Sequence, residues 1–228
     1  DLLWDNIATF WSHDLIQEGN LEVTHLWSAE ITPFQETKVS EDPVLAAEAQ
    51  TAMGMLRAFQ AGERPLAEIL DVELWGRFYA MHDLWSACHG AIWHNLRYYY
   101  NPVTALLEPV AFDAEPFRWC DQSQTIINEF VSTQIFDDPQ IRSAYARELE
   151  RLTQPGYIES IQAELEGEML QLHPALGVEF PQVDLGVDWQ ALKERSLALS
   201  LELQPAQPVR GSYQLAQPVS GETGKPVL

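Results

Sequence analysis

Residues 82–116 read HDLWSACHGAIWHNLRYYYNPVTALLEPVAFDAEP, and they contain the clearest change from helical to extended pattern in the chain. An apolar helical pattern ends in a short polar loop, and residues 96–100 then favour a β-strand because aromatic side chains suit extended backbone. The sequence NPVT at 101–104 is typical of a turn, and residues 106–112 return as a second strand. The stretch therefore predicts a β-hairpin over residues 96–112.

Two polar residues, Asn95 and Asp113, stand at the two ends of this hairpin. Because a hairpin brings its ends together, we expect them to be neighbours in space. Amide and carboxylate oxygens are hard ligands that suit Mg²⁺ when phosphates complete its shell. Protein kinases use such a pair, the asparagine of the catalytic loop and the aspartate of the DFG motif. A hairpin closed by a hydrogen-bonding asparagine and a turn-forming aspartate is the structural alternative.

Outward from the hairpin the sequence is mainly helical. The predicted segments are a helix over 2–16, an extended segment over 21–31, a helix from Asp42-Pro43 to about Phe59, a helix from Asp71 to about His89-Gly90, a helical segment at 126–131, a helix from Asp138-Pro139 to Leu149, a helix from about Gly156 to Leu172, and a short helix over 189–203. We therefore predict an α+β fold, mainly α-helical, over residues 1–203. Residues 204–228 are rich in Pro, Gln, Gly and Ser, which indicates a linker or the start of a further domain.

The composition is strongly acidic. Lysine and arginine number 13 against 34 aspartates and glutamates, so the 228-residue chain carries a formal charge of −21. This excludes the class of nucleic-acid-binding proteins and favours basic partners or divalent cations. No apolar run reaches the roughly 18–20 residues that a membrane-spanning helix needs. Cys88 and Cys120 are too few for a disulfide scaffold, and the sequence leaves open whether they pair.

Three stretches resemble the CotH family of spore-coat kinases, an atypical protein-kinase-like family. They are the aromatic helix over 71–85, WHNLRYYYNPVTALLEPVAFD at 93–113, and IFDDPQIRSAYARELERL at 135–152. The resemblance is good over about residues 70–172, weaker over 1–69, and absent after 204. It implies that the chain holds the C-terminal lobe of a kinase-like domain.

By this resemblance, Asn95 and Asp113 would be the metal ligands of a kinase that uses Mg²⁺ (or Mn²⁺) and ATP to phosphorylate protein hydroxyls. The lobe that grips the nucleotide is then expected upstream of Asp1, because no glycine-rich strand pair or pairing lysine precedes residue 70. Arg97 is a candidate phosphate contact, and a salt bridge to Glu108 on the paired strand is its structural alternative. The family also implies a location outside the cytoplasm or at the cell envelope.

The loop before the hairpin departs from the kinase pattern. Gly90 stands where kinase catalytic loops place the base aspartate, and glycine cannot accept a proton. His89 beside it is a candidate replacement base, since its ordinary pKa suits that role. The alternative is a catalytically inactive pseudokinase that serves as a binding or scaffold module. A zinc site made by His82, Cys88, His89 and His94 is a further alternative, although these residues match no recognised zinc spacing.

Overall fold

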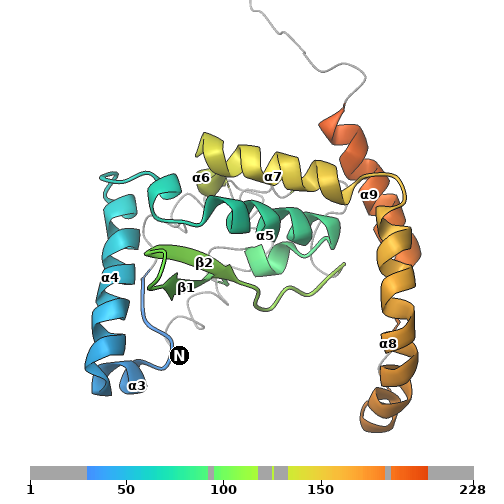
Figure 1. The fold of residues 1–228 in the computed structure, drawn as a ribbon, viewed down its shortest axis with the longest axis horizontal. Coiled ribbons are helices and arrows are strands. Elements are labelled where there is room, and N and C mark those ends of the chain that lie inside the picture. Colours follow the sequence, from blue (N-terminus) through green and yellow to red (C-terminus); the bar gives the residue numbers. More distant parts are fainter. Residues whose placement is uncertain (1–29, 92–94, 118–124, 126–132, 183–185, 205–228) are drawn as a thin grey trace, which may run out of the picture.

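The computed structural model describes residues 30–91, 95–117, 125, 133–182 and 186–204. Its elements, labelled as in Figure 1, are α3 (Glu36–Glu41), α4 (Pro43–Gln60), η2 (Leu66–Glu68), α5 (Val72–Leu84), η3 (Cys88–Ala91), β1 (Arg97–Asn101), β2 (Leu106–Val110), α6 (Thr133–Phe136), α7 (Pro139–Leu152), α8 (Tyr157–Glu179) and α9 (Trp189–Leu203). The fold is α+β and mainly helical, with a two-stranded antiparallel sheet. The helix expected over 2–16, nearly all of the extended segment over 21–31, the segment at 126–131 and residues 205–228 lie outside the described residues.

Helices α5 and α7 form the centre of the molecule and lie side by side (Figure 1). Their backbones approach closely at Gly76, where an added Cβ would lie 2.6 Å from the backbone carbon of Ala144. Large side chains from both helices fill the core around this contact, among them Trp75, Tyr79, Ile141 and Leu149, each almost fully buried. The absence of a side chain at Gly76 therefore lets α5 and α7 share one core.

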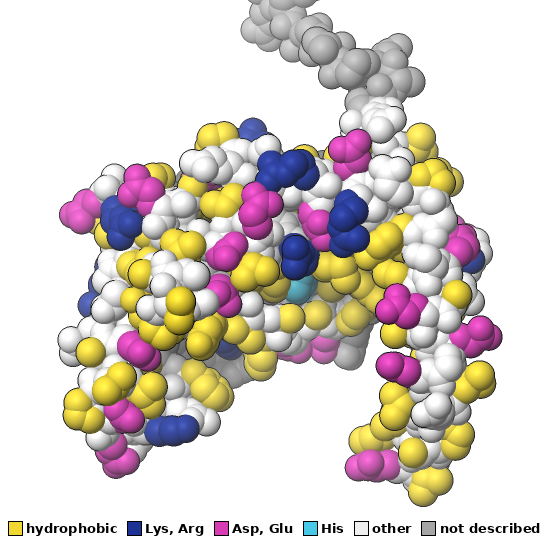
Figure 2. Space-filling view, in the orientation of Figure 1, with side chains coloured by type: hydrophobic (Ala, Val, Ile, Leu, Met, Phe, Trp, Pro, Cys, Tyr) yellow, Lys and Arg dark blue, Asp and Glu magenta, His cyan; other side chains and the backbone are white. Residues whose placement is uncertain are grey.

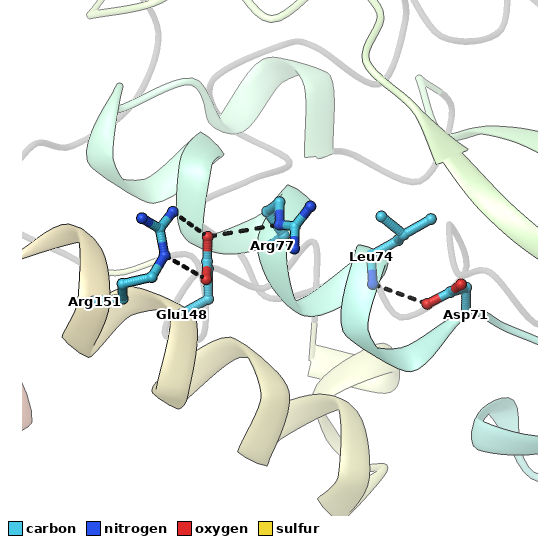
Figure 3. Close-up of polar contacts among 5 residues, drawn as sticks. All are labelled: Asp71, Leu74, Arg77, Glu148 and Arg151. Atoms are coloured by element: carbon cyan, nitrogen blue, oxygen red, sulfur yellow. Dashed lines mark hydrogen bonds and ion pairs between the residues drawn. The ribbon is translucent and has the colours of Figure 1, made fainter. Parts of the chain in front are cut away.

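Four helices begin at an aspartate that caps the free backbone amides of the first turn. The cap is Asp42 for α4, Asp71 for α5, Asp138 for α7 and Asp188 for α9. Figure 3 shows one of them, in which the Leu74 amide donates to the Asp71 carboxylate over 3.0 Å. The starts predicted from Asp42-Pro43, Asp71 and Asp138-Pro139 are confirmed. Each cap of this kind contributes about 1 kcal/mol to helix stability.

The α5–α7 interface is edged by charged side chains (Figure 3). Glu148 of α7 lies between two arginines, 2.7 Å from Arg151 on its own helix and 3.7 Å from Arg77 on α5. The hydrogen bond from Arg151 holds the pKa of the Glu148 carboxyl below its ordinary value. The arginines are more than half exposed, so these pairs add little stability in water.

The β-hairpin lies against the start of α5. Strands β1 and β2 pair in antiparallel register, with Arg97 opposite Val110 and Asn101 opposite Leu106. Leu107 is fully buried, and its carbonyl accepts hydrogen bonds from the Asp71 amide at 3.0 Å and from the Trp75 indole at 2.9 Å. These bonds join a two-stranded sheet, which is marginal alone, to the helical body. The predicted hairpin is confirmed.

Some predicted boundaries differ from the structure. Helix α5 ends at Leu84 instead of near His89-Gly90, because the backbone turns at Ser86 (φ 46°) and then forms the separate short helix η3. Helix α8 continues past Leu172 to Glu179 and contains Pro174. The short helix α3 was not predicted from the sequence. In the described part of the chain, no helix combines the length and apolar character needed to span a membrane.

Candidate functional site

His89, Asn95 and Asp113 meet at the open end of the hairpin. The Asn95 side-chain amide donates to the backbone carbonyl of His89 over 2.9 Å and lies 3.0 Å from His89 Nδ1. The same Nδ1 lies 3.1 Å from the Asp113 carbonyl oxygen and 3.5 Å from the Asp113 carboxylate. The imidazole therefore stands between the asparagine that precedes β1 and the aspartate that follows β2, and the structure brings together three of the residues singled out from the sequence.

The backbone at Asp113 supports this arrangement. Asp113 has a φ of 50°, in the left-handed region that most non-glycine residues avoid, and aspartate tolerates it better than most residues. Glu115 and Phe117 also have positive φ values, 42° and 58°. Residues held in such conformations cluster at functional sites because the surrounding structure must over-determine them. The chain therefore leaves β2 through an unusual path that turns Asp113 back toward His89.

Asn95 is 7% exposed, and its side-chain amide is oriented by its hydrogen bond to His89. A backbone carbonyl only accepts hydrogen bonds, so the amide nitrogen of Asn95 must face His89 and its Oδ1 must face away. The Asp113 side chain is 38% exposed, so its carboxylate is accessible. Together they offer two oxygen ligands, which fits Mg²⁺ only when waters or phosphates complete the shell. Among the described residues, no group of three or more His, Cys, Asp or Glu side chains could hold a metal ion by itself.

Gly90 is closely packed. A Cβ at this position would lie 2.7 Å from His82 Nε2 and 2.9 Å from the carbonyl oxygen of Phe112. No side chain fits there unless the loop or the strand end shifts. The space beside Gly90 is therefore filled by the His82 side chain and by the backbone at Phe112 and Ala114.

His82 lies beneath this loop, near the end of α5. Its Nδ1 is 2.8 Å from the Phe78 carbonyl, whereas its Nε2 is buried without a hydrogen-bond partner in the part of the chain that the structure describes. Burial lowers the pKa of His82, so the neutral imidazole is favoured. His82 thus supports the loop. The zinc alternative loses Cys88 as a ligand, because this cysteine is disulfide-bonded. His94 and Cys120 lie outside the described residues.

Arg97 lies beside the cluster, at the start of β1. Its guanidinium stacks over the Phe112 ring at 4.6 Å from the centroid, and it donates to the Leu96 carbonyl over 3.2 Å. The Glu108 carboxylate instead accepts a hydrogen bond from the Asn101 amide over 2.6 Å. The salt bridge between Arg97 and Glu108, which was the structural alternative, therefore does not form in this hairpin. Phe112 directly precedes Asp113, so the stacked guanidinium lies at the same end of the hairpin as the cluster.

A cavity of about 520 Å³ opens beside this end of the hairpin. Its wall combines residues 30–35, helix α4 and strand β1, and Leu107 of β2 also contributes. Leu96, Arg97 and Tyr98 line it as well, and Asn95 of the His89 cluster directly precedes them in the chain. Most of the wall is apolar, which suits the flat face of an organic ligand. Sequence reasoning did not find this cavity, because its wall joins segments with no common motif.

A second group missed by sequence reasoning holds the end of α5 in place. The Asp83 carboxylate accepts a hydrogen bond from Arg195 of α9 over 2.9 Å and another from the Tyr145 hydroxyl of α7. Arg195 also donates to the Asp83 backbone carbonyl over 3.0 Å. All three side chains are buried, and burial together with the neighbouring carboxylate raises the pKa of Tyr145 well above its ordinary value. Three helices are thus joined just before the loop that carries His89.

Comparisons with known proteins found no relative of this chain. No family model matches the chain, and neither the curated proteins nor the solved structures contain a significant match. The resemblance to the CotH family therefore rests on the sequence stretches quoted above.

Proposed function

We propose that this chain is part of a CotH-like atypical kinase, which in the intact protein transfers phosphate from a nucleotide to protein hydroxyls with the help of Mg²⁺ or Mn²⁺. The observation that carries the proposal is the meeting of His89, Asn95 and Asp113 at the open end of the hairpin. An amide oxygen and a carboxylate there have the chemistry of a phosphate-bound metal site.

The cavity beside the cluster supports the same proposal. A nucleotide base in this cavity would lie against apolar side chains such as Leu56 and Leu107, and its phosphates would extend along β1 toward Asp113. Arg97 lines the cavity and stands at the strand end nearest the cluster, where a guanidinium would bind phosphate oxygens. When bound, the metal would neutralise charge on the phosphates.

His89 has the position of a base in this proposal. Its imidazole contacts both the amide of Asn95 and the carboxylate of Asp113, so its orientation is fixed by the residues that would hold the metal. With the protein substrate bound, one nitrogen of the His89 ring would accept the proton of the substrate hydroxyl. Phosphoryl transfer depends mostly on positioning and electrostatics, so a modest base is sufficient.

The second candidate function is that of a pseudokinase scaffold, and Gly90 favours it. The close approach of His82 and Phe112 leaves no room for the usual base, which is the state expected of a domain that has lost catalysis. Such a domain would bind a nucleotide and a protein partner without turnover. The two candidates share the metal site and differ in the role of His89.

The test uses the full-length protein, with ATP and Mg²⁺ as the ligands and titration calorimetry and phosphate transfer as the readouts. Asp113→Ala removes the only anionic ligand of the pair, so Mg²⁺-dependent ATP binding and any turnover should be lost. Glu108→Gln is the matched control, because this carboxylate of the same hairpin bonds Asn101 and should leave binding unchanged. Unaltered ATP binding by Asp113→Ala would end the proposal.

His89→Ala separates the enzyme from the scaffold. If His89 is the base, turnover should fall by roughly 10²–10⁴-fold while ATP binding survives. A wild-type protein that binds ATP and Mg²⁺ but phosphorylates neither itself nor added proteins would instead support the scaffold.

A further inference from the structure

Helix α8 is anchored at its first turn and then leaves the body of the molecule. Ile158 belongs to the core and is 5% exposed, and it is the only buried residue of this helix. Figure 1 shows the rest of α8 as an arm that runs away from the layer formed by α5 and α7. Beyond this turn several apolar side chains are exposed: Leu165 is 37% exposed and Leu172 is 54% exposed. Beyond its first turn the helix therefore carries apolar side chains that the described part of the fold leaves partly exposed.

Most of the large apolar residues of the arm form one stripe. It consists of Ile158, Ile161, Leu165, Met169, Leu172, Leu176 and Phe180. Their spacings of three and four residues place them on one face of a helix, in continuation of the buried Ile158. Leu170 and Val178 are also exposed but lie on other faces. The stripe is therefore the core-facing stripe of α8 extended beyond the core.

The stripe is flanked by negative charge. Helix α8 contains neither lysine nor arginine, and its acidic residues are Glu159, Glu164, Glu166, Glu168 and Glu179. By helical geometry, Glu166 and Glu168 lie on opposite sides of the stripe. Glu159, at the anchored end, pairs with Lys193 of α9 over 3.3 Å. Figure 2 shows the resulting mixture of apolar and acidic side chains along the arm.

We propose that this stripe is a docking surface for a basic amphipathic helix of another protein. The apolar face of such a helix would pack along Leu165, Leu172 and Phe180, and its lysines or arginines would reach the flanking glutamates, a common mode of helix recognition. The negative charge beside the stripe distinguishes between its possible binding partners. Two copies of α8 would bring glutamates against glutamates, and an anionic membrane surface would repel them. This surface belongs to α8, whereas the His89 cluster belongs to η3 and the ends of the hairpin, so the proposal does not depend on the proposed phosphotransfer.

The test measures binding of a labelled synthetic peptide of about 20 residues by fluorescence anisotropy. The peptide carries leucines on one helical face and lysines on both sides of it. One comparison peptide has the same composition in scrambled order, and a second has glutamates in place of the lysines. The intact protein should bind the basic amphipathic peptide at least about tenfold more tightly than either comparison, and less tightly as salt is raised. Equal binding of the three peptides would overturn the proposal.

Matched variants locate the surface. Leu165→Ser with Leu172→Ser should weaken binding of the basic peptide by about tenfold or more. Leu170→Ser with Val178→Ser removes exposed apolar side chains from other faces of the same helix and should change binding by less than about twofold. Equal losses in the two pairs would contradict the assignment. A dimer in sedimentation, or adsorption to phosphatidylcholine–phosphatidylserine vesicles, would also overturn it if abolished by Leu172→Ser alone, because the stripe would then belong to a second copy or to a membrane.

Discussion

The two ends of helix α5 hold their charged side chains in opposite ways. Near its start, Glu73 pairs with Arg147 of α7 over 2.6 Å, and these side chains are 70% and 57% exposed. At its last turn, Asp83 pairs with Arg195 of α9 over 2.9 Å, and these side chains are 0% and 5% exposed. Similar distances thus join the same chemical groups in water at one end and inside the protein at the other. The exposed pair can separate at little cost, whereas the buried pair cannot.

The difference matters because the buried end leads into the candidate site. Only a short turn separates Asp83 from η3, which carries His89 and Gly90. The buried pair of Asp83 and Arg195 holds the end of α5 that leads into this loop. The exposed pair of Glu73 and Arg147 lies near the start of the helix, which the Asp71 cap already stabilises. Three substitutions test this comparison.

Arg195→Met should destabilise the domain by about 3–5 kcal/mol, because it leaves the carboxylate of Asp83 buried without its cation. Urea unfolding followed by tryptophan fluorescence measures the change. The double variant Asp83→Leu with Arg195→Met should recover part of the loss, since it removes the buried charge together with its partner. A loss below about 1 kcal/mol for Arg195→Met would mean that the two ends of α5 are equivalent.

Gly90→Ala should cost about 1–3 kcal/mol, because the new methyl group meets His82 and the Phe112 carbonyl. Gly167→Ala in α8 is the control: an added Cβ there meets nothing within 4 Å, so the change should be neutral or should stabilise by up to about 1 kcal/mol. Thermal unfolding of the two variants side by side gives the comparison. If both variants gain stability, the packing of the loop against β2 is looser than the structure indicates.

Arg147→Met should lower the free energy of unfolding by less than about 1 kcal/mol, and this small effect should disappear in high salt. The pair is mostly exposed, so water replaces the lost contact with Glu73. Urea unfolding at low and at high ionic strength checks both statements. An effect as large as that of Arg195→Met would remove the distinction between the two ends.

Short-range features of this fold could be predicted from the sequence. A capping aspartate acts on amides two or three residues ahead, so Asp42, Asp71 and Asp138 indicate helix starts without knowledge of the rest of the chain. The hairpin is equally local, and its ends bring Asn95 and Asp113 to the same imidazole. What the sequence could not give was the early end of α5, which depends on the left-handed backbone at Ser86.

Contacts between residues far apart in the chain could not be predicted, because nothing in the sequence indicates which of them will meet. Arg195 occupies a position on α9 that resembles a solvent-facing residue in the sequence, yet it is buried against Asp83. The cavity likewise depends on residues 30–35 lying across from β1. Polar residues in a helical pattern are usually exposed, so only the packed structure distinguishes the buried arginine from its exposed neighbours.

The bond between Arg195 and Asp83 has a consequence for how the protein is made. The two residues are separated by 112 positions in the chain. At about 5–20 residues per second, a ribosome needs roughly 5–20 s to synthesise this interval. During that time Asp83 has no cation to accompany it, and a lone carboxylate stays in water. The Asp83 carboxylate at the last turn of α5 therefore gains its buried partner only after α9 has been synthesised.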